Sequence, residues 1–322
     1  MKKEISVNDF SPISIGQTED AKAGTGCTVI LCEKGMKAGL DIRGGGPASR
    51  ESHLLDPLTA AQEIHAVVLA GGSAFGLNAA GGVMDYLEAN DIGYDVGVTK
   101  VPLVTQSDIF DLTLGDAFTR PDMAMGREAA RLAHTAPNYR DGSFGVGCGA
   151  TVGKICGMDR CMKSGIGSYA LQIGELKIGA LVVVNAFGDI FDWKDGRQIA
   201  GLLDEDKKTL CSTAEIMHEQ ALKIDDGFPG NTTLGVVMTN ASFDKSALCK
   251  IAGMSHNGFA RSIRPVHTAY DGDSIYALSA GDVEADQNAV GLLAAEVISE
   301  AIIRAIDSAD SAFGYPAAKD LG

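Results

Sequence analysis

Glycine is the residue that most constrains how this chain can fold. It accounts for 40 of the 322 residues, about one in eight, without the one-in-three period of collagen. Glycines border several short apolar runs, where a residue without Cβ permits positive φ or a close approach between backbone segments. Hydrophobic residues make up 45% and charged residues 21%, so the sequence predicts a packed globular protein with many tight turns.

The charge of the chain limits its partners. It holds 27 Lys and Arg against 42 Asp and Glu, a formal net charge of −15, and no basic run is longer than the pair Lys2-Lys3. Binding to a phosphate backbone depends on clustered basic side chains, so neither nucleic acid nor an anionic membrane is an expected partner. Residues 178–184, the longest apolar run, are too few to span a bilayer. Residues 1–9 lack the apolar core of a signal peptide, and we expect a cytoplasmic protein.

The cysteines indicate a reduced protein rather than a disulfide framework. There are seven, an odd number, scattered along the chain. Cys27 and Cys32, like Cys156 and Cys161, are separated by four residues, whereas structural zinc sites use tighter pairs. We therefore expect these four side chains to be small buried hydrophobic groups rather than metal ligands.

Apolar runs and turn signals predict strands and helices in mixed order. The expected strands are 28–32, 65–70, 169–173, 177–185, 233–239 and 274–279, and the expected helices are 74–89, 123–134, 202–221, 242–260 and 289–306. Residues 43–51, with three glycines and a proline, are expected to form a loop. Because strands and helices do not strictly alternate, the pattern favours sheets covered by helices over a doubly wound fold.

Several common catalytic signatures are absent. There is no G-x-x-x-x-G-K-[ST] phosphate loop and no H-E-x-x-H zinc helix. Residues 71–76 (GGSAFG) lack the G-x-G-x-x-G spacing, so a tight strand-to-helix turn is the favoured interpretation over a phosphate site. The same segment has Phe75 where a G-x-S-x-G nucleophile elbow needs glycine. The six histidines are isolated in the sequence, with no evident partner for a catalytic triad.

A turn rich in glycine, proline and asparagine, residues 225–231, leads into the strand expected at 233–239, with threonines at the junction. A threonine held in this way suits an N-to-O acyl shift. Its hydroxyl attacks the preceding carbonyl, the ester hydrolyses, and the threonine becomes a new N-terminus. The freed α-amine, with an ordinary pKa of about 8, can act as general base without a histidine. The alternative is a Thr-Thr pair that simply opens a strand.

Eight segments carry a resemblance to a known family. They are residues 24–29 (GTGCTV), 50–57 (RESHLLDP), 68–77 (VLAGGSAFGL), 101–112 (VPLVTQSDIFDL), 149–154 (GATVGK), 183–189 (VVNAFGD), 230–234 (GNTTL) and 271–274 (DGDS). In this order they resemble the self-cleaving N-terminal-nucleophile aminopeptidases, which include L-aminopeptidase/D-esterase, the β-peptidyl aminopeptidases and the 6-aminohexanoate-oligomer hydrolases. The resemblance implies an α+β fold, a four-layer α-β-β-α sandwich with two packed sheets between helices.

The resemblance also implies a division of the chain. Cleavage between Asn231 and Thr232 would convert the single domain 1–322 into an α fragment of residues 1–231 and a β fragment of residues 232–322. Thr232 would then be the nucleophile. Asn185 matches a side-chain amide that donates to the oxyanion, where preorganised donors stabilise developing charge.

Charged residues complete the implied site. Asp271 and Asp273 match two aspartates that lie near the nucleophile and help to move protons. Lys154 matches a lysine that pairs with a carboxylate or donates to a carbonyl. Asp271, Asp273 or Glu51 would anchor the ammonium group of an aminopeptidase substrate. One position departs from the family, because some members have a tyrosine hydroxyl in the oxyanion hole where this chain has Phe110.

The activity implied by the resemblance is hydrolysis of small peptides, amides or esters through an acyl-enzyme, in a homo-oligomer of such units. This chemistry requires neither a metal nor an organic cofactor. Two alternatives remain: an acyl transferase similar to ornithine acetyltransferases, which share the self-cleaving layout, and a relative that never cleaves and acts in binding or as a scaffold. The candidate substrates are L-amino amides, small peptides, β-peptides, D-amino esters and ω-amino acid oligomers.

Overall fold

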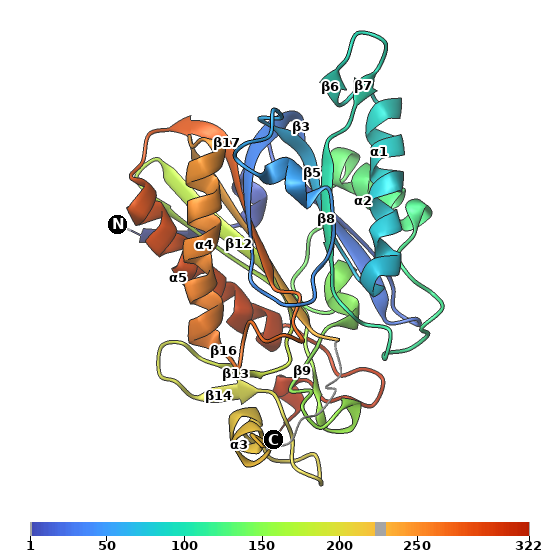
Figure 1. The fold of residues 1–322 in the computed structure, drawn as a ribbon, viewed down its shortest axis with the longest axis vertical. Helices are drawn as coiled ribbons and strands as arrows, with labels where there is room; N and C mark the ends of the chain where they lie inside the picture. Colours follow the sequence, from blue (N-terminus) through green and yellow to red (C-terminus); the bar gives the residue numbers. More distant parts are fainter. Residues whose placement is uncertain (1, 223–229, 322) are drawn as a thin grey trace.

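Strands form the centre of the computed structural model, and helices cover them on both sides (Figure 1). The structure describes residues 2–222 and 230–321. Within these ranges the main sheet has ten strands. Their order is β1 (Lys2–Ile5), β11 (Ile166–Ile173), β12 (Leu176–Asn185), β15 (Thr232–Ala241), β17 (Ser274–Val283), β3 (Thr25–Ile42), β5 (Ile64–Ala70), β8 (Val104–Asp108) and β4 (Ala48–Arg50), and β2 (Ser14–Asp20) pairs with β3 outside this order.

The long strand β3 joins two halves of this sheet. Its 18 residues pair first with β2 and β5, where Cys27 lies opposite Ala70. After a register shift between Leu31 and Met36, its second half pairs with β17. One strand therefore passes from the β2–β3–β5–β8 half to the β11–β12–β15–β17 half, which lets the halves pack face to face.

Three apolar layers separate the sheets and helices. The helices are α1 (Ala79–Ala89), α2 (Met123–Thr135), α3 (Thr213–Glu219), α4 (Lys245–Ser262) and α5 (Gln287–Asp307). One layer lies between β12, β15, β17 and helices α4 and α5, a second between the two halves of the sheet, and a third between β3, β5 and helices α1 and α2. The predicted α-β-β-α sandwich is confirmed.

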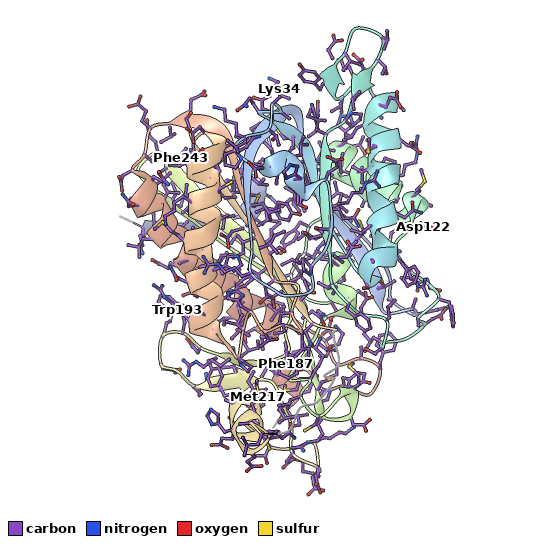
Figure 2. All side chains as sticks on the ribbon, viewed as in Figure 1. Lys34, Asp122, Phe187, Trp193, Met217 and Phe243 are labelled. Carbon is purple, nitrogen blue, oxygen red and sulfur yellow. The ribbon has the colours of Figure 1, made fainter. Side chains whose placement is uncertain are left out.

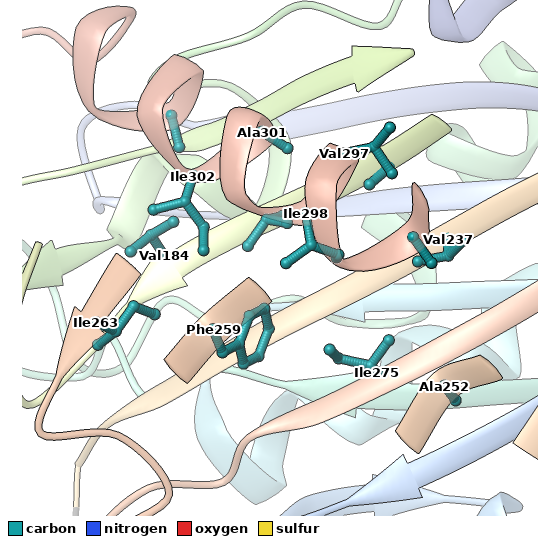
Figure 3. Packing of buried hydrophobic residues seen from close by; sticks show 14 of the residues in the cluster. Val184, Val237, Ala252, Phe259, Ile263, Ile275, Val297, Ile298, Ala301 and Ile302 are labelled. Carbon is teal, nitrogen blue, oxygen red and sulfur yellow. The ribbon is translucent and has the colours of Figure 1, made fainter. Parts of the chain in front are cut away.

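Period-two alternation places each strand between two layers. On β15, Leu234, Val236 and Met238 belong to the middle layer, whereas Val237 faces α4 and α5. Figure 3 shows Val237 packed in that outer layer with Phe259 of α4 and Ile298 of α5. Continuous apolar runs such as 178–184 follow from this burial on both faces.

Smaller strands lie at the edges of the sandwich. They are β6 (Tyr94–Asp95) with β7 (Lys100–Val101), β9 (Thr151–Val152) with β10 (Met162–Lys163), and β13 (Asp189–Phe191) between β14 (Gln198–Ala200) and β16 (Ile263–Arg264). The β13–β14–β16 group and α3 lie at the lower end of the molecule in Figure 1. The hairpin predicted at 169–185 is confirmed as β11 and β12.

Two predicted helices differ in the structure. The helix expected at 202–221 is wrong over most of its length, because only α3 is α-helical there. The Asp189 carboxylate accepts hydrogen bonds from the backbone N–H groups of Leu202 and Thr213 at 2.9 and 2.7 Å, and these tertiary bonds hold the segment open. The helix expected at 74–89 begins as a 3₁₀ helix, Ser73–Asn78, because the Gln106 side chain bonds to its backbone at Gly76 and Ala80.

Other differences are local. The loop expected at 43–51 contains the short strand β4, and the strand expected at 28–32 is part of the longer β3. Residues 225–229 of the turn before the threonines lie outside the described residues. Cys27, Cys32 and Cys161 are buried as predicted, whereas Cys156 is exposed. In the described ranges, none of the helices has the length and apolar character needed to cross a membrane.

Candidate active site

Three strand ends meet at one end of the sandwich. β12 ends at Asn185, β15 begins at Thr232, and these two residues are paired across the antiparallel ladder. On the other side of β15, Asn231 forms a parallel bridge with Asp271, just before β17. Phe187, labelled in Figure 2 at the lower end of the strands, lies two residues after the end of β12. The sheet register therefore brings together segments that are far apart in the sequence.

The hydroxyl of Thr232 is hydrogen-bonded to the peptide group that precedes it. Thr232 Oγ1 donates a short hydrogen bond to the carbonyl oxygen of Asn231. The backbone N–H of Gly272 donates to the same oxygen at 2.9 Å. Thr232 is only 4% exposed, so both hydrogen bonds act in an environment with little competition from water.

Lys154 is a buried cation beside this peptide bond. Its ammonium group donates to Asn185 Oδ1 at 2.7 Å, to Asn185 O at 3.2 Å and to Gly230 O at 3.3 Å. Its own backbone N–H donates to Phe187 O at 3.0 Å, which ties it to the end of β12. Burial lowers the pKa of Lys154 to about 7, because a charged ammonium loses its hydration.

Asn185 connects Lys154 to a neighbouring loop. Its Oδ1 also accepts from the Thr151 backbone N–H at 3.1 Å, and its Nδ2 donates to the carbonyl oxygen of Phe110 at 3.0 Å. The side-chain amide is thus held on both sides and is completely buried. The main chain of Phe110, where the family resemblance calls for a tyrosine hydroxyl, contributes an acceptor to this network.

The two aspartates of the DGDS motif are buried and have different partners. Asp271 Oδ2 accepts from the backbone N–H and the hydroxyl of Thr268 at 2.9 and 2.6 Å. Asp273 Oδ1 accepts from the Thr233 backbone N–H at 2.8 Å. Burial, followed by repulsion from Asp273, raises the pKa of Asp271 to about 6.

His267 was not predicted as part of the site, because the histidines are isolated in the sequence, but in the folded chain it pairs with Asp273. Its Nδ1 donates to Asp273 Oδ2 at 2.8 Å, and its backbone N–H donates to the same oxygen at 3.1 Å. Behind it lies His256, with ring centroids 4.7 Å apart. Burial lowers the pKa of His256 to about 4, so that ring is neutral. The only sequence signal was the short distance between His267 and the DGDS motif.

The glycine-rich loop 43–46 supports the acidic turn. Backbone N–H groups of Arg43 and Gly46 donate to the carbonyl oxygens of Asp273 and Asp271, both at 2.9 Å. A Cβ on Gly44 would lie 2.3 Å from the backbone nitrogen of Asp273. The sequence indicated a loop here, but not that the loop packs against the DGDS motif. Glu51 is exposed at the start of the 3₁₀ helix Ser52–Leu55, outside this network of described residues.

The arrangement can support acyl chemistry. The Thr232 hydroxyl and the Gly272 backbone N–H both donate hydrogen bonds to the carbonyl oxygen of Asn231. A buried lysine and two buried carboxylates in the same region can move protons. Among the described residues there is no group of three or more His, Cys, Asp or Glu side chains arranged to hold a metal ion.

The fold is an α-β-β-α sandwich that solved aminopeptidases share. The fold is similar to L-aminopeptidase D-Ala-esterase/amidase from Ochrobactrum anthropi, described as a variant of the Ntn hydrolase fold (TM-score 0.66, 17% identity, 94% of this chain and 86% of that chain). It is also similar to a β-aminopeptidase from a Burkholderia species (TM-score 0.65, 18% identity, 96% and 89% covered).

The chain belongs to peptidase family S58, whose sequence pattern matches residues 6–319. It is similar to an uncharacterized aminopeptidase of Mycobacterium leprae, with 37% identity over 97% of this chain and 92% of that protein. It is also similar to a 6-aminohexanoate-oligomer endohydrolase of Paenarthrobacter ureafaciens, with 29% identity over 92% of this chain and 84% of that protein. The resemblance seen in the motifs is confirmed, and the chain is a peptidase.

Proposed function

We propose that the chain cleaves its own peptide bond between Asn231 and Thr232 and then acts as an N-terminal-threonine aminopeptidase. The observation that carries this proposal is the hydrogen bond from the Thr232 hydroxyl to the carbonyl oxygen of Asn231. A hydroxyl in this position is adjacent to the carbonyl carbon that it must attack, which is the requirement of an N-to-O acyl shift.

In the mature enzyme, the freed α-amine of Thr232 takes the hydroxyl proton as Oγ1 attacks the acyl carbon of the substrate. The leaving amine departs with that proton, and water then hydrolyses the acyl-enzyme. Lys154, Asp271 and Asp273 move or stabilise protons around this centre. Asn185 positions Lys154 through Oδ1, and its remaining Nδ2 proton supplies a donor to the oxyanion.

The substrates follow from the new N-terminus and the relatives. We propose that the enzyme removes N-terminal residues from small peptides, amides or esters, with Asp271 or Asp273 binding the substrate ammonium. One relative is named for an aminopeptidase and another for hydrolysis of 6-aminohexanoate oligomers, so both α-amino and ω-amino substrates belong in the assay. A homo-oligomer and a cytoplasmic location remain predictions.

Intact mass spectrometry of purified protein, followed over time, tests the proposal. The expected products are residues 1–231 and 232–322, whose summed mass exceeds that of the whole chain by one water. N-terminal sequencing should return Thr-Thr-Leu-Gly for the smaller fragment. A chain that stays whole and inactive would instead support the non-cleaving alternative, and a whole but active chain would remove Thr232 from its role.

A substrate panel tests the second half of the proposal. Aminoacyl nitroanilides, β-peptides, D-amino esters and 6-aminohexanoate oligomers are compared with and without an added amine acceptor. Release of acyl groups to water supports the hydrolase. Preferential transfer to the amine would identify an acyl transferase of the ornithine acetyltransferase type.

A further inference from the structure

The backbone N–H of Gly272 is already hydrogen-bonded to the carbonyl that self-cleavage would attack. It donates to Asn231 O at 2.9 Å, and the Thr232 hydroxyl donates a hydrogen bond to the same oxygen. We propose that this N–H is the oxyanion donor for self-cleavage and serves again, beside the Asn185 amide, as an oxyanion donor during turnover. The inference rests on the proposed function and adds a catalytic group to it.

The chemistry places negative charge on the atom that Gly272 contacts. Thr232 Oγ1 bonds to the Asn231 carbonyl carbon, and its proton passes through a nearby base to the Thr232 nitrogen. The electron pair of the carbonyl moves onto Asn231 O in the tetrahedral intermediate. Collapse then breaks the bond between Asn231 and Thr232 and leaves an ester and an amine. Water hydrolyses the ester and restores the hydroxyl, so one water is consumed for each bond cleaved.

The N–H of Gly272 is held in place from several directions. Asp271, which precedes it, accepts from Gly46 N through its carbonyl and from Thr268 through its carboxylate. Asp273, which follows it, accepts from the Arg43 backbone N–H. A donor that is already oriented needs no reorganisation when charge develops, which is the condition for effective oxyanion stabilisation.

Glycine at this position is required by the approach of the nucleophile. A Cβ on Gly272 would lie 2.6 Å from Thr232 Oγ1 and 3.0 Å from Gly46 O. The residue therefore presents its N–H without a side chain that would displace the hydroxyl. The Asn185 side chain, in contrast, donates from Nδ2 to the carbonyl oxygen of Phe110 in the uncleaved chain. Of these two donors, Gly272 is the one that already contacts the scissile carbonyl oxygen.

The same donor suits turnover because both reactions pass through an ester on Thr232 Oγ1. During maturation the acyl group is that of Asn231, and during catalysis it comes from the substrate. An acyl carbon bonded to the same oxygen occupies the same place, so its carbonyl oxygen faces the same N–H. Departure of Asn231 leaves this donor available for the substrate.

An amide-to-ester replacement at position 272 tests the donor without adding atoms. Glycolic acid replaces Gly272 by nonsense suppression in cell-free translation of the full chain, which changes N–H to O. The matched control is the same replacement at Gly46, whose N–H donates to Asp271 O, also at 2.9 Å. The ester at 272 also makes the Asp271 carbonyl a weaker acceptor for the Gly46 N–H. The ester at 46 removes that same hydrogen bond, so it measures how much its loss contributes. Circular dichroism and thermal unfolding verify that both proteins fold.

The ester at 272 is expected to slow self-cleavage about tenfold to a hundredfold and to lower kcat of the matured enzyme by a similar factor, with KM little changed. The ester at 46 removes one bond that orients this donor but not the donor itself, so it should slow both reactions by a much smaller factor than the ester at 272. Equal effects of the two esters, or loss of only one of the two rates, would overturn the shared donor. If the unmodified chain cleaves itself and the chain with the ester at 272 cleaves at the same rate, this inference is refuted and the proposed function is not. A normal chain that never cleaves refutes the proposed function as well.

Discussion

Asn185 and Thr232 are the last paired residues of the antiparallel ladder between β12 and β15. Their backbones are held by the sheet, so each side chain starts from a fixed position on a strand. This places the amide that binds Lys154 opposite the hydroxyl proposed as nucleophile. A site built on strand ends is preorganised by the core beneath it.

Replacing Asn185 with Asp separates the two roles of its side chain. The Asn185→Asp variant keeps an acceptor for Lys154 and loses the Nδ2 donor. We expect kcat to fall about a hundredfold, which is typical of losing an oxyanion donor. Asn240→Asp is the control, because Asn240 also accepts from one backbone N–H and donates to one backbone carbonyl, at the other end of β15. Near-normal kcat in Asn185→Asp would leave only the Lys154 contact as its role.

Thr232→Ala is expected to leave a whole, inactive chain of 33.5 kDa, because no hydroxyl remains to attack Asn231. Thr233→Ala is the matched control: the Thr233 hydroxyl is buried and has no hydrogen-bond partner among the described residues. Gel electrophoresis and intact mass measure both. Cleavage of Thr232→Ala at the normal bond would end the assignment, and loss of cleavage only in Thr233→Ala would transfer it to Thr233.

His267 is expected to act as a positioning residue for Asp273. Without its Nδ1 donor, the His267→Ala variant should lose about ten- to a hundredfold in kcat, the range for one hydrogen bond to a charged group, with little change in KM. His267→Asn should recover most of the activity, because an asparagine amide can reach the position of Nδ1 and tolerates the positive φ of 59° found here. Equal activity of the Ala and Asn variants would contradict this role.

The close packing of the 43–46 loop predicts different effects at neighbouring glycines. Gly44→Ala forces a methyl group against the backbone of Asp273 and should destabilise the chain by about 1–3 kcal/mol, with slower cleavage. Gly46→Ala should be tolerated, since the nearest atom to its Cβ would be 3.9 Å away. Thermal unfolding and cleavage rates compare the two, and equal loss in both would show that the contact at Gly44 is not limiting.

The depressed pKa of Lys154 predicts a change of stability with pH. The folded chain loses this proton near pH 7, whereas the unfolded chain keeps it up to its ordinary value of 10.5. Between these values the unfolded state binds more protons, so the free energy of unfolding rises with pH by about 1 kcal/mol per pH unit from this group.

The measurement compares the uncleaved Thr232→Ala chain with the same chain carrying Lys154→Met. Urea unfolding at pH 7, 8 and 9 should show the stability of the first rising relative to the second at each step, because the other titrating groups are common to both. A constant difference over this range would mean that Lys154 titrates outside it.

The sequence was sufficient for elements with a strong pattern. Buried strands such as 233–239 and amphipathic helices such as 123–134 were predicted close to their observed positions, since their side chains follow the period of the element. The segment 202–221 was not, because bonds from the distant Asp189 override its local helical pattern. Strand order and the passage of β3 between the two halves also depend on long-range pairing.

In the site, too, residues within motifs could be predicted from the sequence, whereas residues that depend on long-range contacts could not. Thr232, Asn185, Lys154 and the aspartates were predicted through motifs, and the structure brings them to one end of the strands. His267 and Gly272, for which roles are proposed above, were not predicted, because His267 contacts Asp273 only in the folded chain and Gly272 contributes a backbone N–H. A main-chain donor leaves no chemical signature in its side chain.

The position of β15 has a consequence for how a cut chain would behave. β15 lies between β12 and β17, and β17 is paired in turn with β3, so segments from before and after Asn231 alternate across the sheet. Scission at the first residue of β15 would break one covalent bond and leave these interstrand ladders in place. The two fragments would stay associated noncovalently through dilution and chromatography and would separate only in denaturant. The new amino terminus would be held by hydrogen-bonded strands on both sides and would not fray.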